Sequence, residues 1–286
     1  MRKHIAKTSR KKPMDWIRFL LVWGAGFITI AVLLYLIGFI LAKGIPHIKV
    51  SLFSLTYTIE NQSLFPALVT TLMMVTITLL IAVPFGVCTA VYLVEYAPRG
   101  SRLVRVIRMT TETLSGIPSI VFGLFGYIFF ATWLGWGKSI LAGCFTLAIM
   151  ILPLIMRTTE ESLKSIPDSY REGSFSLGAG KLRTVWQVTL PPAMPGIFAG
   201  IILAVGRIVG ETAALIFTIG SVIKIPDNLF SQGRTLALHV LQLASQGHNR
   251  DEAYATAVVL LVVVVGINAL SSSIERRFKQ KQSSKG

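Results

Sequence analysis

Long apolar runs alternate with shorter polar segments along most of the chain. A helix that crosses the hydrocarbon core of a bilayer needs about 20 apolar residues, and six runs are close to that length or longer. The turn WLGWGKS between the third and fourth runs is short and contains Trp, Gly and Lys, which is typical of a hairpin at a membrane interface. The pattern predicts six membrane-spanning helices, near residues 16–42, 67–94, 113–134, 139–156, 193–221 and 253–270.

Composition supports an all-α membrane protein. The 286 residues are 53% hydrophobic and 14% charged, with a mean hydropathy of +0.66, and soluble domains are far more polar. The first apolar run follows a basic segment, as in a secretory signal peptide. That run is much longer than the roughly 7 to 15 apolar residues of a signal peptide, so we expect an uncleaved first span.

The positive charge is unevenly distributed. The net charge of +15 fits either a nucleic-acid-binding protein or a membrane protein with basic cytoplasmic loops, and position distinguishes these classes. Of the 28 Lys and Arg residues, seven lie at or before Arg18, four between Arg99 and Arg108, five between Arg157 and Arg183, and five after Leu270. These are the termini and alternate loops. We therefore expect both termini on the cytoplasmic side of the inner (plasma) membrane, with lipid and not nucleic acid around the chain.

Residues for catalysis or metal binding are scarce. The four His and two Cys residues are scattered without ligand spacing, and no Gly-rich loop ending in Lys-Ser/Thr is present to hold a nucleotide phosphate. No Ser–His set or carboxylate pair at usable spacing appears within the spans. The sequence predicts no catalytic residue, metal or cofactor, and it makes a membrane-embedded enzyme the least favoured class.

A polar segment, REGSFSLGAGKLRTVWQVTLPPAMPGI (171–197), interrupts the apolar pattern. Pro167 and Asp168 favour a helix start, and Gly178 or Gly180 can adopt the left-handed conformation that ends a helix. A second short helix should follow from residue 181, and the prolines of LPPAMPG should interrupt regular helix before the fifth span. Such a helix–turn–helix unit is either an amphipathic segment resting on lipid or a contact surface.

The spacing in this segment resembles the cytoplasmic loop of ATP-binding-cassette importers. That signature is Glu-Ala-Ala, three residues, Gly, nine residues, Ile, any residue, Leu-Pro. Here Gly-Ser replaces Ala-Ala, which lowers helix propensity by up to about 1 kcal/mol at the glycine. The resemblance implies a coupling helix that docks into a groove on a separate cytoplasmic ATPase. The matching residues are Glu172, Gly173, Ser174, Gly178, Val188, Leu190 and Pro191.

Two opposite charges lie within the fifth apolar run. Arg207 and Glu211 are four residues apart and would share one face of a continuous helix, together with Gly196, Gly200 and other small residues. A charge at the bilayer centre costs from about 2.5 to more than 10 kcal/mol, so this face should point away from lipid. Arginine can present two donors to one oxyanion, and Glu211 would balance it in the absence of an anion. An ion pair that only holds the bundle together is the alternative.

Two stretches, the fifth span and ETLSGIPSIVFGLFGYIFF (112–130), resemble the phosphate importer permeases of the PstA type, and the resemblance extends from about Thr70 to the end of the sixth span. It implies a six-helix, MetI-like type I importer permease fold. It also implies a second permease of the PstC type, two copies of an ATPase of the PstB type, and a phosphate-binding protein of the PstS type. Pro118 either kinks the third span or belongs to the pathway. The implied pathway residues are Arg207, Glu211, Thr212, Ser115 and Ser119.

The expected organisation is a basic cytoplasmic tail (1–16), a first span with an outward loop (17–66), a permease domain (67–271) containing the coupling loop 165–192, and a basic cytoplasmic tail (272–286). The expected function is ATP-driven import of inorganic phosphate. Alternatives are import of sulfate, molybdate or phosphonate, or a stand-alone secondary carrier or channel. Two interrupted helices would favour a carrier, and the sequence offers no convincing pair. The outward loop 222–252 could receive a binding protein or cover the bundle.

Overall fold

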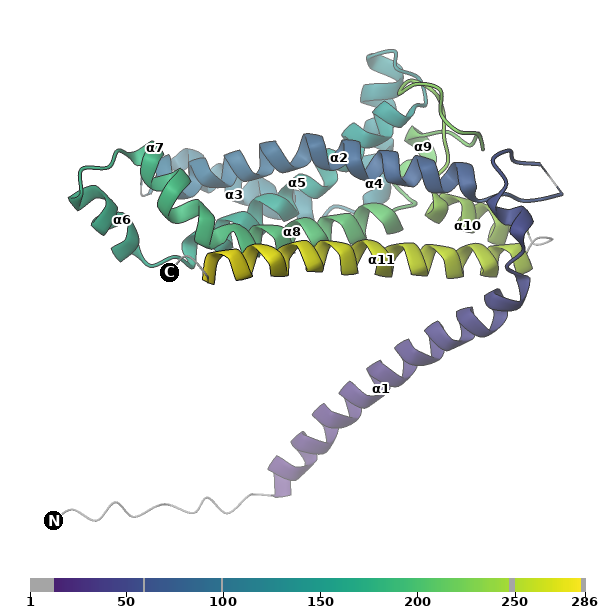
Figure 1. Cartoon of the computed structure of the whole chain (residues 1–286), viewed down its shortest axis with the longest axis horizontal. Coiled ribbons are helices and arrows are strands. Elements are labelled where there is room, and N and C mark those ends of the chain that lie inside the picture. Colours follow the sequence, from purple (N-terminus) through teal and green to yellow (C-terminus); the bar gives the residue numbers. More distant parts are fainter. Residues whose placement is uncertain (1–12, 59, 99, 247–249, 284–286) are drawn as a thin grey trace.

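The computed structural model describes residues 13–58, 60–98, 100–246 and 250–283 (Figure 1). Every regular element in these ranges is a helix, which confirms the predicted fold class. Most of the predicted N-terminal tail, residues 1–12, lies outside the described residues, as do residues 284–286. Within the described part, five helices are long and apolar enough to cross a membrane, and a bent pair makes six if it is counted as one span.

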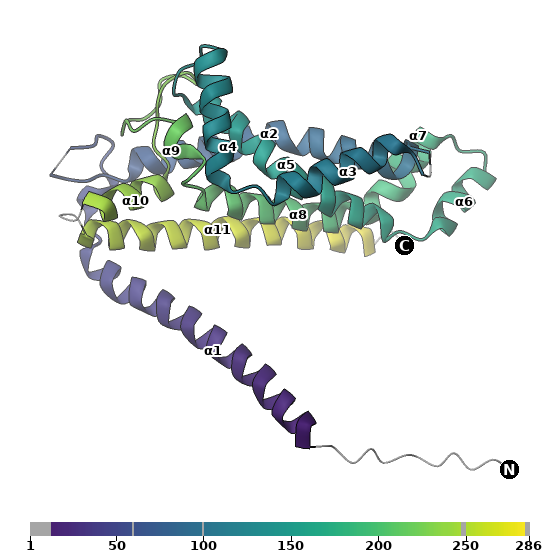
Figure 2. The same cartoon turned by 180° about the vertical axis from the view of Figure 1, so that it is seen from behind.

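The long helices run side by side, with one exception. Helices α2, α5, α8 and α11 form a bundle, whereas α1 diverges from it and meets α11 only at the end that carries α10 (Figures 1 and 2). Most described side chains of α1 are exposed, so lipid or another subunit must cover this apolar helix. The bounds are Pro13–Gly44 for α1, Phe65–Val91 for α2, Ile140–Lys164 for α5, Leu190–Gly210 for α8, Leu236–Gln246 for α10 and Arg250–Ser283 for α11.

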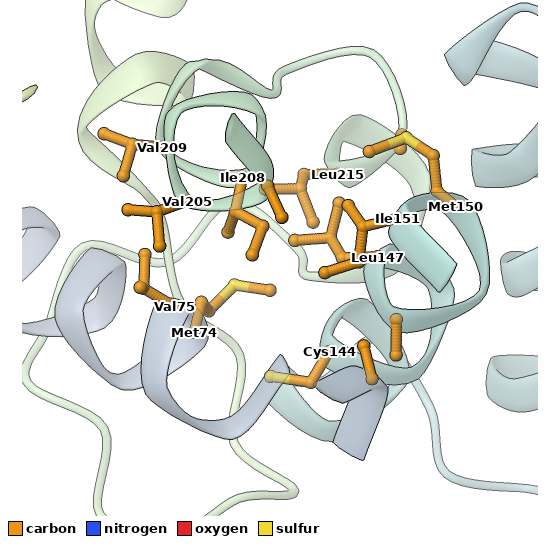
Figure 3. Close-up of a cluster of buried hydrophobic side chains, with 14 of the residues drawn as sticks. Met74, Val75, Cys144, Leu147, Met150, Ile151, Val205, Ile208, Val209 and Leu215 are labelled. Atoms are coloured by element: carbon orange, nitrogen blue, oxygen red, sulfur yellow. The ribbon is translucent and has the colours of Figure 1, made fainter. Parts of the chain in front are cut away.

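The apolar core lies where α2, α5 and α8 meet (Figure 3). Small residues let these helices approach, as is common in membranes. A methyl group added at Gly196 would collide with the side chain of Ser162, and one at Gly200 with that of Thr158. These two contacts show that α5 and α8 pack antiparallel. The labelled core residues are Met74, Val75, Cys144, Leu147, Met150, Ile151, Val205, Ile208, Val209 and Leu215.

The third span differs from the prediction. A continuous helix over 113–134 was expected, but α3 (Arg102–Ser115) ends before Pro118, and a new helix bent by 103° runs from Ser119 to Trp133. Its first part is α4 (Ser119–Gly126), which projects across the bundle direction (Figure 2). Proline disfavours helical backbone at the residue before it and cannot donate to the preceding turn. The helix of the third span is therefore interrupted before Pro118 and is not merely kinked there.

The fifth span also differs at both ends. The prolines of LPPAMPG do not delay the helix, because α8 starts at Leu190 and contains them. Pro191 and Pro192 lie in its first turn, where N–H groups have no helical acceptor, and a widened π-type turn over Val185–Thr189 leads into it. The predicted continuation to residue 221 is wrong, because α8 ends at Gly210 and a separate short helix, α9 (Leu215–Thr218), follows.

Other boundaries lie beyond the apolar runs. The polar continuations of the fourth and sixth spans are helical, so α5 extends to Lys164 and α11 to Ser283. The predicted hairpin before α5 is present, with Gly135 and Gly137 at positive φ. In the outward loop, α10 packs against α2 and α11 and buries Leu236, Leu238 and Leu243. The amphipathic part of that loop therefore covers the end of the bundle.

Candidate functional site

The helix–turn–helix predicted around Gly178 is present at one end of the bundle (Figure 1). Helix α6 (Asp168–Ser176) begins after Pro167, and α7 (Lys181–Thr184) follows the turn. Gly178 has φ of +79°, a conformation that costs other residues about 1 to 2 kcal/mol. No atom lies within 4 Å of a methyl group built there. Backbone conformation and not crowding therefore favours glycine in this turn.

Arg171 fixes the base of α6. Its guanidinium makes three hydrogen bonds of 2.8 to 3.1 Å to the carboxylate of Glu95, which follows α2. It also donates to the carbonyl oxygens of Leu163 and Ile166 at 3.0 and 2.9 Å and to Asp168 Oδ1 at 3.1 Å. The side chains of Arg171 and Glu95 are only 14% and 7% exposed. Hydrogen bonding to Glu95 raises the pKa of Arg171 above its ordinary value, so this arginine is a permanently charged anchor.

The outer side of the same unit is exposed and partly apolar. Leu177 is 90% exposed, and a hollow of about 630 Å³ lies between α6 and the segment after α7. Glu172 and Gly173 are exposed beside it, and the Ser174 hydroxyl hydrogen-bonds that of Thr184 at 2.8 Å. Leu190 instead packs inward, close to Leu163 and Ala193, and Pro191 is the next residue of α8. Further exposed apolar side chains are Tyr170, Phe175, Leu182 and Trp186.

A second feature is a charged cavity of about 300 Å³ lined by α3, α5 and α8. The register of the antiparallel helices α5 and α8 shows how far this cavity extends. Since Gly196 lies beside Ser162 and Gly200 beside Thr158, the same register places Arg207 near residues 150–154. The cavity therefore extends from Arg207 to Lys164, about 20 Å along α5. Its polar lining is Arg108, Thr111, Glu112, Ser115, Arg157, Glu160, Glu161, Lys164 and Arg207.

Arg207 and Glu211 do not share a helical face. Glu211 follows the last residue of α8 in extended backbone, and its Oε1 accepts a hydrogen bond from the backbone N–H of Ala214 at 3.1 Å. The carboxylate thus bonds the backbone of the residue that precedes the short helix α9. Arg207 is exposed in the cavity wall, and within the described part of the chain no ion pair involves it. The expected pair fails because Gly210 ends the helix between the two charges.

The other predicted pathway residues fall into two groups. Ser115 lines the cavity with Arg207, whereas Ser119 and Thr212 lie at the two helix breaks and do not line it. These breaks are neighbours, because Gly123 of α4 lies against the backbone of Ala213 and Ala214. The sequence showed no convincing pair of interrupted helices, yet the structure contains one. Irregular backbone at membrane depth occurs where it is buried or lines a cavity.

Sequence reasoning missed the charged group at the other end of the cavity. The side chain of Glu160 is 9% exposed, and its Oε1 lies 2.6 Å from both Arg108 Nη2 and Lys164 Nζ. The spacing of Glu160 and Lys164 on one helix was a signal for part of it. The sequence analysis placed Arg108 in a loop. It therefore did not predict helix α3, which brings Arg108 to Glu160. Among the described residues, no group of three or more His, Cys, Asp or Glu is placed to hold a metal ion.

A bundle of apolar helices with interrupted spans and an open, charged cavity on one side is typical of polytopic transport proteins. The family described as "Binding-protein-dependent transport system inner membrane component" matches residues 82–284. The chain belongs to this family and is an inner membrane component, a membrane subunit and not itself the catalytic one. This membership excludes the stand-alone carrier, the channel and the membrane-embedded enzyme.

Curated relatives carry more specific names. The chain is 39% identical over 206 residues to the "Probable ABC transporter permease protein YqgI" of Bacillus subtilis, covering 66% of this chain and 70% of that one. It is 36% identical to the "Phosphate transport system permease protein PstA 1" of Mycobacterium tuberculosis, covering 73% and 69%. It is 31% identical over 260 residues to the PstA protein of Haemophilus influenzae, covering 87% and 90%. The resemblance noted in the sequence is confirmed.

Solved structures share the fold. An inward-facing MetNI methionine ABC transporter matches with a TM-score of 0.61 and 23% identity, over 75% of this chain and 94% of that one. A bacterial alginate ABC transporter bound to its periplasmic protein matches with a TM-score of 0.69 and 15% identity, over 93% and 96%. These likenesses confirm the MetI-like permease fold.

Proposed function

We propose that this chain is the permease subunit of an ATP-driven importer for inorganic phosphate. The observation that carries the proposal is Arg207, a guanidinium in the wall of an open, charged cavity with no ion-pair partner among the described residues. A planar guanidinium can give two parallel hydrogen bonds to one oxyanion and stays charged at any relevant pH. Relatives named PstA, which match up to 87% of the chain, supply the choice of phosphate.

Transient attraction suits a pathway better than tight binding. Since the Glu211 carboxylate is held by the Ala214 N–H, it does not neutralise Arg207 from the same helical face, and the cavity keeps its positive charge there. Ser115 in the same lining adds a hydroxyl. Ser119 and Thr212 belong to the proposed pathway as residues of the two neighbouring breaks, whose rearrangement would open and close it.

The ATPase is a separate subunit in this proposal. Two copies of an ATPase of the PstB type would bind the two permeases, this chain and a partner of the PstC type, and a phosphate-binding protein of the PstS type would deliver the anion. The exposed surface around Glu172, Gly173, Ser174 and Gly178 would enter a groove on the ATPase, with Leu190 and Pro191 transmitting its movement to α8. That end of the bundle would then face the cytoplasm, and cytoplasmic termini remain part of the proposal.

Reconstitution tests the whole proposal. The chain is combined with candidate partners in liposomes that enclose ATP, and labelled phosphate is supplied outside with the binding protein. We expect ATP-dependent uptake that stops when ATP is replaced by a non-hydrolysable analogue. Absence of uptake, with a demonstrably assembled complex, would contradict the proposal.

The turn at Gly178 tests the coupling surface separately. In Gly178→Val, the branched side chain is forced into φ of +79°, so the turn should rearrange and ATPase binding should be lost. Co-purification of the ATPase with the permease measures this. Gly180→Ala is the matched control, since this glycine of the same turn has φ of −76° and no atom within 4 Å of an added methyl group. Normal assembly and uptake in the valine variant would refute the docking role.

Another oxyanion is the second candidate, because an arginine in an open cavity would serve sulfate, molybdate or phosphonate as well. Uptake of labelled phosphate in the presence of each competitor discriminates between them. If phosphate is the cargo, a tenfold excess of sulfate or molybdate should leave uptake unchanged. Strong competition by one of these anions would replace phosphate as the assigned substrate.

A further inference from the structure

We propose that the end of the cavity near Lys164 is a second anion subsite, formed by Arg108 and Lys164 and regulated by Glu160. Inorganic phosphate that has already crossed would bind there and slow further import. This inference rests on the proposed function, because it takes phosphate as the cargo and places α6 and α7 on the cytoplasmic side. It assigns a role to the charged group that the transport pathway around Arg207 does not use.

The charge balance at this subsite is uneven. Arg108 Nη2 and Lys164 Nζ both lie 2.6 Å from the same oxygen, Glu160 Oε1. One carboxylate therefore neutralises two cations, and one positive charge has no counter-charge within the group. The side chain of Glu160 is nine-tenths buried, while those of Arg108 and Lys164 are half exposed. The two cations are thus accessible from the cavity, whose lining also carries the carboxylate of Glu112, whereas the carboxylate of Glu160 is not accessible.

Arg108 also has hydrogen-bonding capacity to spare. Its Nε is buried and lacks a hydrogen-bond partner among the described residues, although a guanidinium offers five donors. Arg171, by comparison, donates to two carboxylates and two carbonyl oxygens. A purely structural ion pair would be expected to resemble Arg171. The unpaired Nε shows that Glu160 does not saturate this guanidinium, and the half-exposed side chain can direct its other donors toward an anion.

The location gives the subsite a function. Lys164 is the last residue of α5, and the α6 segment begins four residues later, so the subsite lies at the mouth of the cavity next to the coupling surface. Arg207 is about 20 Å away along the same helix. An anion leaving Arg207 reaches Arg108 and Lys164 before it leaves the cavity. At a high phosphate concentration on that side, the occupied subsite would repel the next anion.

Initial rates of import into liposomes test the inference. The lumen, which encloses ATP and faces the coupling surface, contains either phosphate or gluconate at equal ionic strength, so that screening of charges is the same. We expect lumenal phosphate to lower the initial rate several-fold in the wild type. The half-inhibitory phosphate concentration should rise at least fivefold in Arg108→Gln and in Lys164→Gln. It should fall in Glu160→Gln, because both cations then lose their shared carboxylate.

Opposite effects of the two kinds of substitution separate ligand binding from structural support. Arg108→Gln and Glu160→Gln break the same ion pair, so a structural role predicts that both variants change in the same direction. Arg108→Lys, which keeps the charge, should retain inhibition. Arg105→Gln is the matched control, since this arginine lies on the same helix but outside the cavity lining.

Each outcome has a distinct meaning. Import that ignores lumenal phosphate in the wild type, or changes of equal sign in Arg108→Gln and Glu160→Gln, would overturn the subsite and leave the phosphate importer intact. Complete absence of ATP-driven phosphate import would overturn both. If Glu160→Gln does not assemble, two other variants still test the subsite. The half-inhibitory phosphate concentration should rise in Lys164→Gln, and inhibition should be retained in Arg108→Lys.

Discussion

Arg171 in α6 and Arg207 in α8 are both helical arginines, but their surroundings are opposite. Arg171 is nearly buried at the base of α6, and its donors bond Glu95, Asp168 and two carbonyl oxygens. Arg207 lies exposed in the cavity wall without an ion pair among the described residues. The number of guanidinium donors that already have partners therefore distinguishes an arginine that stabilises the structure from one that is available to a ligand. Neither its charge nor its position in the sequence makes this distinction.

The largest expected effect is the loss of stability when Arg171, whose donors are all close to partners, is replaced. Arg171→Ala leaves the carboxylate of Glu95 buried without its main partner, which should cost about 3 kcal/mol of stability and release α6 from α2. Thermal unfolding in detergent measures the loss. Removing Glu95 as well, in Arg171→Ala with Glu95→Ala, should recover part of it because no unpaired charge remains. An unchanged melting temperature in the single variant would show that the anchor is not structural.

Arg207→Gln should show the reverse pattern. The chain should fold and assemble with unchanged thermal stability, since no partner is left unpaired. Import should fall about 10- to 100-fold, because hydrogen bonds to a charged group contribute about 1.5 to 3 kcal/mol. Uptake assays combined with co-purification of the ATPase measure both quantities. A loss of assembly, or full import activity, would remove the distinction between the two arginines.

Arg234 is an intermediate case at the opposite end of the bundle. It donates to Ser221 O and to His239 Nδ1, the latter at 3.4 Å, and burial lowers its pKa. Since arginine has no acceptor, the His239 ring must be neutral and accept at Nδ1. Burial, together with the charge of Arg234, lowers the pKa of His239 to about 4.

A pH dependence follows from this pair. In the unfolded chain His239 titrates near pH 6.5, so the unfolded state binds the extra proton between pH 6.5 and about 4. Stability is then fully present above pH 6.5 and is lost as the pH falls, by about 2 kcal/mol at pH 5. Melting temperatures of the wild type and His239→Gln should diverge less as the pH falls. Parallel pH curves for both proteins would contradict the assignment.

The smallest effect should come from an exposed pair. Lys224 Nζ lies 2.6 Å from Asp227 Oδ2, with both side chains more than half exposed. Solvent-exposed pairs of this kind contribute less than about 1 kcal/mol, so Lys224→Gln should leave the melting temperature almost unchanged. This variant calibrates the thermal measurements. A shift as large as that of Arg171→Ala would mean that burial does not set the ranking.

Local features could be read from the sequence, and contacts between distant segments could not. The turn at Gly178 and the apolar spans depend on residues within one or two helical turns, and both are present. The break after Gly210 escaped prediction because apolar residues continue through it, and a periodic pattern does not detect a change from helical to extended backbone at Glu211. The position of Arg108 beside Glu160 depends on packing of α3 against α5, which no spacing within either helix reports.

The hydrogen bonds of Arg171 also have a mechanical consequence. One side chain links α6 to the last residues of two separate bundle helices, through Glu95 after α2 and through the carbonyl oxygen of Leu163 in α5. Three segments are thereby joined at one point with little freedom to slide. We therefore expect that a force applied to α6 would displace the ends of α2 and α5 together and would not bend the loop that carries α6.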